Sequence, residues 1–233
     1  MTTIADNLQQ IRARIAQACA AAGRDPASVS LLAVSKTFGP EAVLQAAQAG
    51  QSAFGENYLQ EAVEKMAALR QMGAPTLQWH CIGPVQSNKT RLVAEHFDWV
   101  HSVDRLKIAQ RLSEQRPPGL PPLQVCLQVN ISGETSKSGF APAEVLDVAR
   151  TVAALPRLRL RGLMAIPEPA GDLAAQRAPH RALRELLAAL NDSGLALDTL
   201  SMGMSADLEA AVAEGATIVR VGTAIFGGRT YTA

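Results

Sequence analysis

Two patterns of apolar and polar positions alternate along the chain. Residues 4–22 place apolar side chains at helical spacing, at Ile4, Leu8, Ile11 and Ile15, which predicts an amphipathic helix. Short and nearly continuous apolar runs follow, the first over residues 31–36, and such runs are typical of parallel strands covered on both faces. Most runs are followed by a stretch with helical spacing, so the sequence predicts an α/β protein.

Eight strands and their connecting helices follow from this alternation. The predicted strands cover residues 31–36, 53–55, 77–82, 99–101, 123–129, 158–163, 199–201 and 216–221. The predicted helices cover residues 40–50, 56–72, 88–96, 104–115, 142–155, 173–192 and 206–214, and a short segment at 223–227 ends the series. Eight such units favour a (β/α)8 TIM barrel with an extra N-terminal helix. An open doubly wound sheet is the alternative, but no Gly-x-Gly-x-x-Gly fingerprint follows the first strand.

The chain of 233 residues is long enough for one barrel or for two smaller domains. Residues 116–122 contain four prolines and one glycine and resemble an interdomain linker. However, a strand follows at once and the alternation does not change character, so we expect a single domain over residues 1–233.

Composition excludes several classes of function. The net charge of +1 and the lack of a long basic run argue against a nucleic-acid partner. No apolar segment reaches membrane-spanning length, and the charged N-terminal helix is unlike a signal peptide. Cys19, Cys81 and Cys126 are unclustered and lack metal-ligand spacing. We therefore expect a cytoplasmic protein with reduced, buried cysteines and no membrane partner.

Lys36 ends the first predicted strand. Ligands of parallel α/β proteins collect at the carboxyl ends of strands. Partial burial there disfavours the ammonium form, and a neutral lysine amine forms a Schiff base with a carbonyl ligand. The alternative is a lysine that leaves the strand into solvent, and the position of Lys36 taken alone favours that alternative.

Two loops near the C-terminus have the chemistry of a phosphate site. Residues 200–205 lead from a strand into a helix, and residues 219–227 end a strand with glycine, a hydroxyl and a short helical turn. Backbone N–H groups at such strand ends bind phosphate, and barrels often use the loops after strands seven and eight. Ordinary turns, with Ser205 capping a helix, are the alternative. Two such loops at the two expected strands favour phosphate.

Arg220 lies at the end of the last strand, two residues before Gly222. It forms either a salt bridge at the barrel rim or a charged hydrogen bond to a flat ligand in the barrel mouth. A lysine amine, a phosphate cradle and an arginine together suit a phosphorylated aldehyde that has a ring nitrogen. Pyridoxal 5′-phosphate (PLP) has this outline.

The sequence resembles the YggS/PROSC family of PLP-binding proteins, the PLP homeostasis proteins, which are related to the N-terminal barrel domain of alanine racemase. The likeness covers residues 5–230. It rests on the motifs Ala-Val-Ser-Lys at 33–36, Phe-Gly-Glu-Asn-Tyr at 54–58, residues 79–89, Ser-Lys-Ser-Gly at 136–139, residues 161–166, Ser-Met-Gly-Met-Ser at 201–205 and residues 220–227.

The resemblance implies seven cofactor-binding residues. They are Lys36, which holds PLP as a Schiff base; Ser201, Gly222 and Thr223, at the phosphate; Arg220, at the pyridine nitrogen; and Asn57 and Met202, which line the pocket. Phe38 and Ala206 depart from the residues that relatives often carry, and both concern only the rim.

Three further polar residues have open roles. His80 either lines the cofactor mouth or is a hydrogen-bonded barrel residue, and Lys89 follows in the next loop. Lys137 is either a second aldehyde-reactive lysine or, as we expect, a solvated loop residue.

Three functions compete: a PLP carrier without turnover, a PLP-dependent amino-acid racemase, and a Schiff-base aldolase without PLP. A racemase needs two bases. In the related racemases the second base is a tyrosine from an added β domain, whereas this chain ends after the barrel and has only Tyr58 and Tyr231. An arginine at the ring nitrogen also weakens the ring as an electron sink, and the aldolase leaves Arg220 without a role. We expect a non-enzymatic, monomeric carrier whose partners are PLP and apo PLP-dependent enzymes.

Overall fold

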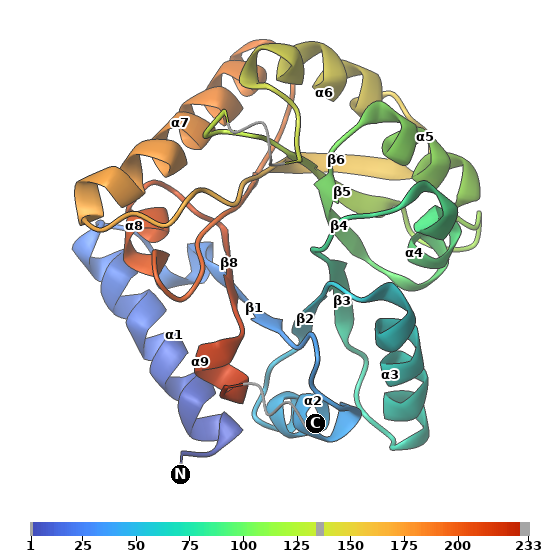
Figure 1. Cartoon of the computed structure of the whole chain (residues 1–233), viewed down its shortest axis with the longest axis vertical. Coiled ribbons are helices and arrows are strands. Elements are labelled where there is room, and N and C mark those ends of the chain that lie inside the picture. Colours follow the sequence, from blue (N-terminus) through green and yellow to red (C-terminus); the bar gives the residue numbers. More distant parts are fainter. Residues whose placement is uncertain (1, 134–137, 229–233) are drawn as a thin grey trace.

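Eight parallel strands close into a barrel in the order β1 to β8, with β8 paired to β1 (Figure 1). This computed structural model describes residues 2–133 and 138–228. It confirms the predicted TIM barrel. The strands are β1 (Ser30–Val34), β2 (Ala53–Glu56), β3 (Gln78–Cys81), β4 (Trp99–Val103), β5 (Leu123–Gln128), β6 (Leu158–Met164), β7 (Thr199–Ser201) and β8 (Ile218–Val221).

The α-helices surround this barrel as an outer ring (Figure 1). They are α1 (Ile4–Ala21), α2 (Pro40–Gln48), α3 (Leu59–Gln71), α4 (Thr90–His96), α5 (Leu106–Gln115), α6 (Val145–Ala153), α7 (Leu173–Asp192), α8 (Leu208–Ala213) and α9 (Thr223–Phe226). Three short 3-10 turns also occur among the described residues: η1 (Pro26–Ser28), η2 (Ser87–Lys89) and η3 (Pro142–Glu144).

Helix α1 is the predicted extra helix before the barrel. Thr3 and Asp6 cap its first turn reciprocally, and its buried face includes Leu8, Ile11 and Ile15. It packs against α2, α8 and α9. The Asn7 side chain donates a 2.8 Å hydrogen bond to the Ile225 carbonyl, so α1 also fixes the position of α9.

Two boundaries differ from the prediction near the site. β1 ends at Val34 rather than at Lys36, because Thr37 adopts a left-handed conformation with φ +69° and turns the chain out of the sheet. α3 begins at Leu59 rather than at residue 56, because Glu56 still pairs with Cys81 in the sheet.

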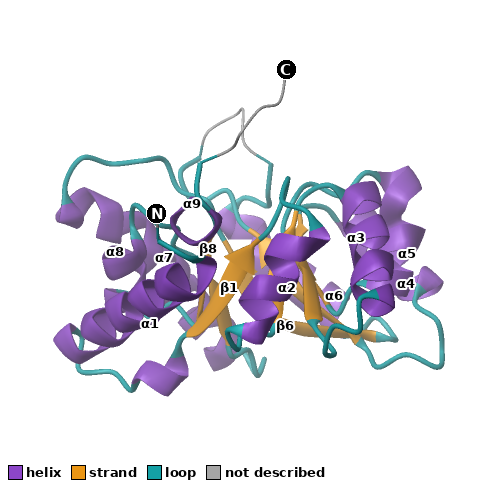
Figure 2. Ribbon diagram, turned by 90° about the horizontal axis from the view of Figure 1, so that it is seen from below, coloured by secondary structure: helices purple, strands orange, loops and turns teal. Residues whose placement is uncertain are grey.

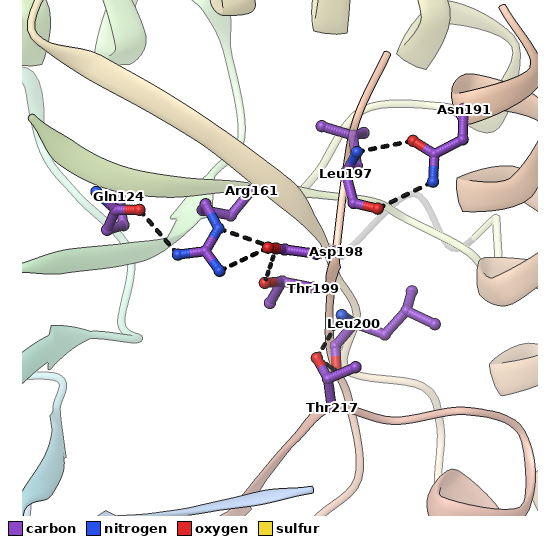
Figure 3. Close-up of polar contacts among 8 residues, drawn as sticks. All are labelled: Gln124, Arg161, Asn191, Leu197, Asp198, Thr199, Leu200 and Thr217. Carbon is purple, nitrogen blue, oxygen red and sulfur yellow. Dashed lines mark hydrogen bonds and ion pairs between the residues drawn. The ribbon is translucent and has the colours of Figure 1, made fainter. Parts of the chain in front are cut away.

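The barrel interior combines apolar and polar side chains. Leu32, Trp99, Cys126, Met164 and Ile218 form a small apolar cluster that is separate from the large core between strands and helices. At the N-terminal ends of the strands, Arg161 binds Asp198 at 2.7 and 2.9 Å and the Gln124 amide oxygen at 2.9 Å (Figure 3). Its guanidinium also lies 4.8 Å from the Trp99 ring centre. These contacts fasten β5, β6 and β7 at that end.

Among the described residues, no helix combines the length and the apolar character needed to cross a bilayer. Cys19, Cys81 and Cys126 are all buried and free. Burial raises the thiol pKa of Cys81 and of Cys126 to about 12, which makes both inert as nucleophiles at neutral pH.

Candidate functional site

Helix α9 lies at one end of the barrel (Figure 2). A cavity of about 350 Å³ is lined by residues that follow the carboxyl ends of the strands and by the first residue of α9. We call it the lysine cavity. Its described lining consists of Val34, Lys36, Phe38, Asn57, Ile82, Ile166, Met204, Ser205, Ala206, Arg220, Gly222, Thr223 and Gly227. Five of the seven predicted site residues therefore line one cavity: Lys36, Asn57, Arg220, Gly222 and Thr223.

Lys36 lines this cavity from the turn after β1, and its side chain is half-buried. The turn is held on both sides of the lysine. The Ser35 hydroxyl donates a 2.7 Å hydrogen bond to Glu56 Oε1, and the Thr37 N–H donates a 3.0 Å bond to Glu61 Oε1. The backbone that carries Lys36 is thus fixed by carboxylates of β2 and α3.

A buried ion pair lies behind this turn. Lys65 Nζ donates to Glu56 Oε1 at 2.7 Å, to the Ser35 carbonyl at 2.9 Å and to Glu61 Oε1 at 3.1 Å. Glu56 is fully buried, and burial raises the pKa of its carboxyl although the Lys65 charge acts in the opposite direction. Sequence reasoning missed this pair. The available signal was a lysine on the apolar stripe of α3, between Ala62 and Met66.

The loops after β7 and β8 form the anion-binding wall of the lysine cavity. Gly222 is the N-cap of α9, and a Cβ there would lie 3.1 Å from the Val34 carbonyl oxygen, so a glycine suits the close approach of β8 to β1. The first N–H groups of a helix have no acceptor within it. Thr223 and Ser205 add hydroxyl groups beside them. N–H and O–H donors at one wall match the chemistry of a phosphate.

Arg220 supplies the only described cation of the cavity besides Lys36. Its guanidinium donates to Ser201 Oγ at 2.7 Å and to the Ala165 carbonyl at 2.9 Å. Burial lowers its pKa to about 10, so it stays charged at neutral pH. It forms no ion pair with any carboxylate of the described residues, although the charge of Asp207 acts on it from further away. Its guanidinium therefore attracts an acceptor group to the cavity.

Ser201 and Met202 are placed differently from the sequence-based expectation. Both are completely buried, and neither belongs to the described lining of the lysine cavity. The Ser201 hydroxyl instead lies between Arg220 and His101, at 2.7 Å from each. β7 ends at Ser201, and its next residues bring Met204 and Ser205 to the cavity in place of these two.

Asn57 follows β2 and lines the lysine cavity, and its buried Oδ1 atom has no hydrogen-bond partner in the part of the chain that the structure describes. The loop after β3 passes close behind it, because a Cβ on Gly83 would lie 2.8 Å from the Asn57 Cα. Asn57 thus offers an acceptor to a ligand donor. At the rim, the rings of Phe38 and Phe226 stack with their centres 5.0 Å apart.

The residues with open roles do not join the described lining. His80 is 3% exposed and hydrogen-bonded inside the barrel, which confirms the structural alternative for it. Lys89 is exposed on η2. Lys137 and Tyr231 lie outside the described residues. Within residues 2–133 and 138–228, no group of His, Cys, Asp or Glu is arranged to hold a metal ion.

Comparisons with known proteins agree with this geometry. The model of the alanine racemase N-terminal domain matches residues 6–230. The pyridoxal phosphate homeostasis protein of Pseudomonas aeruginosa is 65% identical over 100% of this chain and 99% of its own length, and that of Escherichia coli is 54% identical over 100% and 99%.

Solved structures extend this likeness to the fold. PipY of Synechococcus elongatus with PLP bound is 38% identical, with a TM-score of 0.83 over 97% of this chain and 100% of that one. Alanine racemase of Corynebacterium glutamicum shares the fold, with 21% identity and a TM-score of 0.68 over 95% of this chain and 62% of the racemase. The chain thus belongs to the family of pyridoxal phosphate homeostasis proteins, which is built on the alanine racemase N-terminal barrel.

Proposed function

We propose that this protein binds PLP in the lysine cavity and serves intracellular PLP homeostasis by storing, buffering or delivering it, without catalytic turnover. The observation that carries the proposal is one cavity faced by a lysine amine, by a buried arginine cation and by the N-cap of α9. The names of its relatives and the PLP bound to PipY support the same ligand.

The cavity fits the cofactor in chemistry and in size. About 350 Å³ lies within the range of small-molecule pockets. Lys36 would bond covalently to the aldehyde carbon, and Arg220 would donate to the ring nitrogen. Gly222, Thr223 and Ser205 would hold the phosphate, and Asn57 would accept a hydrogen bond at the ring edge. When bound, PLP supplies an electrophilic aldehyde and a conjugated ring.

The residues around Lys36 support a carrier rather than a racemase. Apart from Lys36, the described lining holds no His, Tyr, Cys, Asp or Glu that could serve as a second base. Tyr58 is 51% exposed and does not line the cavity. Arg220 donates hydrogen bonds but does not accept them, so it leaves the ring nitrogen unprotonated and the ring a weak electron sink.

Delivery would take place at the open end of the barrel, where the lysine cavity meets solvent, and its recipients would be apo PLP-dependent enzymes. We propose a single domain over the whole chain and a cytoplasmic location, because three free, buried cysteines suit a reducing compartment.

The binding site is tested by reducing the PLP-loaded protein with borohydride and mapping the labelled peptide. The label should fall on Lys36. Lys36→Ala should lose the visible absorbance of the lysine adduct, whereas the control Lys89→Ala, an exposed lysine on η2, should keep it. Label on another lysine of the wild-type protein would overturn the assignment, and a wild-type protein without bound chromophore would favour the aldolase.

The absence of turnover is tested with the same loaded protein in deuterated water. It should exchange the α-protons of alanine and serine no faster than free PLP, yet transfer PLP to an apo-enzyme faster than PLP escapes into buffer. Exchange with a kcat of about 1 s⁻¹ or more would make the racemase the better interpretation.

A further inference from the structure

One chain of hydrogen bonds crosses the barrel interior from the lysine cavity to the opposite end. Its successive contacts are Arg220 Nη1 to Ser201 Oγ at 2.7 Å, Ser201 Oγ to His101 Nδ1 at 2.7 Å, His101 Nε2 to His80 Nδ1 at 2.8 Å, and His80 Nε2 to Gln78 Oε1 at 3.0 Å. The first four side chains are 5% exposed or less, whereas Gln78 is exposed.

The chain of hydrogen bonds ends in a second cavity. Gln78, His80 and Trp99 line this cavity of about 600 Å³, which we call the basal cavity, together with the first residues of β1, β2 and β8. The imidazole of His80 also stacks on Trp99, with ring centres 5.3 Å apart and planes within 5°. The two histidines are therefore locked by packing as well as by hydrogen bonds.

The contacts allow only one direction of donation that satisfies every hydrogen. Arg220 can only donate, so Ser201 Oγ accepts from it. If the Ser201 hydroxyl then donates to His101 Nδ1, His101 donates from Nε2 to His80 Nδ1, and His80 donates from Nε2 to Gln78 Oε1. In the reverse direction the Gln78 amide would be turned over, and the Ser201 hydrogen would have no acceptor among the described residues. Both histidines are thus neutral and protonated on Nε2.

The charges around the hydrogen-bond chain agree with neutral imidazoles at His80 and His101. Burial lowers the pKa of His80 to about 3, and burial, His80 and Arg220 together lower that of His101. Among the described residues, no carboxylate contacts either ring: the neighbours are Gln78, Trp99, Ser201 and, acting through its charge, Arg220. A positive charge on either imidazole would have no counterion in the barrel interior.

We propose that Gln78, His80 and His101 are positioning residues for Arg220: their oriented chain turns the Ser201 hydroxyl into an acceptor that fixes the guanidinium at the floor of the lysine cavity. The ring-nitrogen contact of Arg220 rests on the proposed function. This hydrogen-bond chain gives Ser201 a role inside the barrel. The residues that orient Arg220 through it extend to the end of the barrel opposite the ligand.

The orientation of the chain is tested on the ligand-free protein by ¹⁵N NMR of its histidine side chains. The side chains of His80 and His101 should both show the neutral tautomer protonated on Nε2 at pH 7, and His80→Gln should remove one of these two signals. His180, whose Nε2 also donates a hydrogen bond, to Asp207, and His96 on α4 are identified by the signals lost in His180→Gln and His96→Gln. Protonation on Nδ1, or a charged imidazolium, at either position would overturn the proposal. This readout does not depend on PLP.

Its effect on the cofactor is tested with paired variants. Gln at position 80 can accept from His101 and donate to Gln78, whereas Leu can do neither. His80→Leu should therefore weaken PLP binding by about tenfold and shift the visible band, while His80→Gln keeps wild-type behaviour. His96→Leu, on the surface helix α4, is the control and should also behave as wild type.

Gln78→Leu removes the last acceptor at the exposed end without touching the interior. It should change the band in the same direction by a smaller amount, which keeps the test valid if His80→Leu does not fold. PLP binding and a visible band equal to those of the wild type in Gln78→Leu, and in His80→Leu where it folds, would overturn the proposal. A wild-type protein that binds no PLP would contradict the proposed function instead, and the NMR result would still decide the orientation of the chain.

Discussion

Ser201 is the last residue of β7 and Ser205 lies in the loop after it, and of these two only Ser205 belongs to the described lining of the lysine cavity. Ser201 is fully buried against Arg220 and His101. Ser205→Ala should therefore weaken PLP binding by about 1.5–3 kcal/mol, the usual loss of one hydrogen bond to a charged group. Pyridoxal, which has no phosphate, should bind Ser205→Ala and the wild type equally well in a titration. Ser201→Ala should weaken both ligands, because it acts through Arg220. Equal loss of both ligands in Ser205→Ala would contradict the phosphate role.

The buried histidines also determine how stability depends on pH. The pKa of His80 is lowered to about 3 in the folded protein from 6.5, so the unfolded chain binds one more proton at any pH between these values. Stability should therefore fall as the pH falls from about 6.5 toward 3, by about 1.4 kcal/mol per pH unit for this residue. Urea unfolding at pH 7, 6, 5 and 4 should give a shallower slope for His80→Gln than for the control His96→Gln. Equal slopes would mean that the buried imidazole takes up a proton without unfolding.

Helix α3 and the turn after β1 are joined through Lys65, and this connection holds the backbone on which Lys36 stands. Lys65→Met would leave the fully buried Glu56 carboxylate without its counterion, which costs about 3–5 kcal/mol of unfolding free energy in buried pairs. The double variant Lys65→Met/Glu56→Gln should recover part of this loss, because the unpaired charge is gone. Arg70→Met, on the exposed side of the same helix, is the matched control for urea unfolding. A loss below about 1 kcal/mol in Lys65→Met would show that Glu56 is protonated in the folded protein.

The helices and strands were predictable because each has its own pattern of apolar residues: helical spacing in the helices and nearly continuous runs in the strands. The predicted helix at 173–192 and the strand at 199–201 match α7 and β7 residue for residue. The two errors near the site have different causes. Thr37 ends β1 early through its left-handed backbone, and Glu56 extends β2 through its pairing with Cys81. Neither effect has a local pattern.

The hydrogen-bond chain could not have been predicted from the sequence. His80 and His101 lie on β3 and β4, whereas Ser201 and Arg220 lie on β7 and β8, and Ser201 comes 100 residues after His101 in the sequence. Only closure of the barrel brings them together across its interior. The different positions of Ser201 and Ser205 depend on the same fact. Only the closed barrel shows that Ser201, at the end of β7, contacts His101 and Arg220, whereas Ser205 in the following loop lines the lysine cavity.

We expect a monomer from the surface of the described residues. The exposed large apolar side chains among the described residues all stand at the ends of elements or in loops, not along one face of a helix or strand: they are Tyr58, Met72, Leu120, Ile166, Leu173 and Met204. Ile166 and Met204 line the lysine cavity, so the ligand explains part of this exposure. A stable interface needs a contiguous patch of about 800 Å² on each partner, and scattered side chains do not supply one. Sedimentation equilibrium at about 50 µM should therefore give the chain mass of 24.6 kDa with and without PLP. Twice that mass, in either state, would contradict the monomer and would point to an interface built from polar contacts.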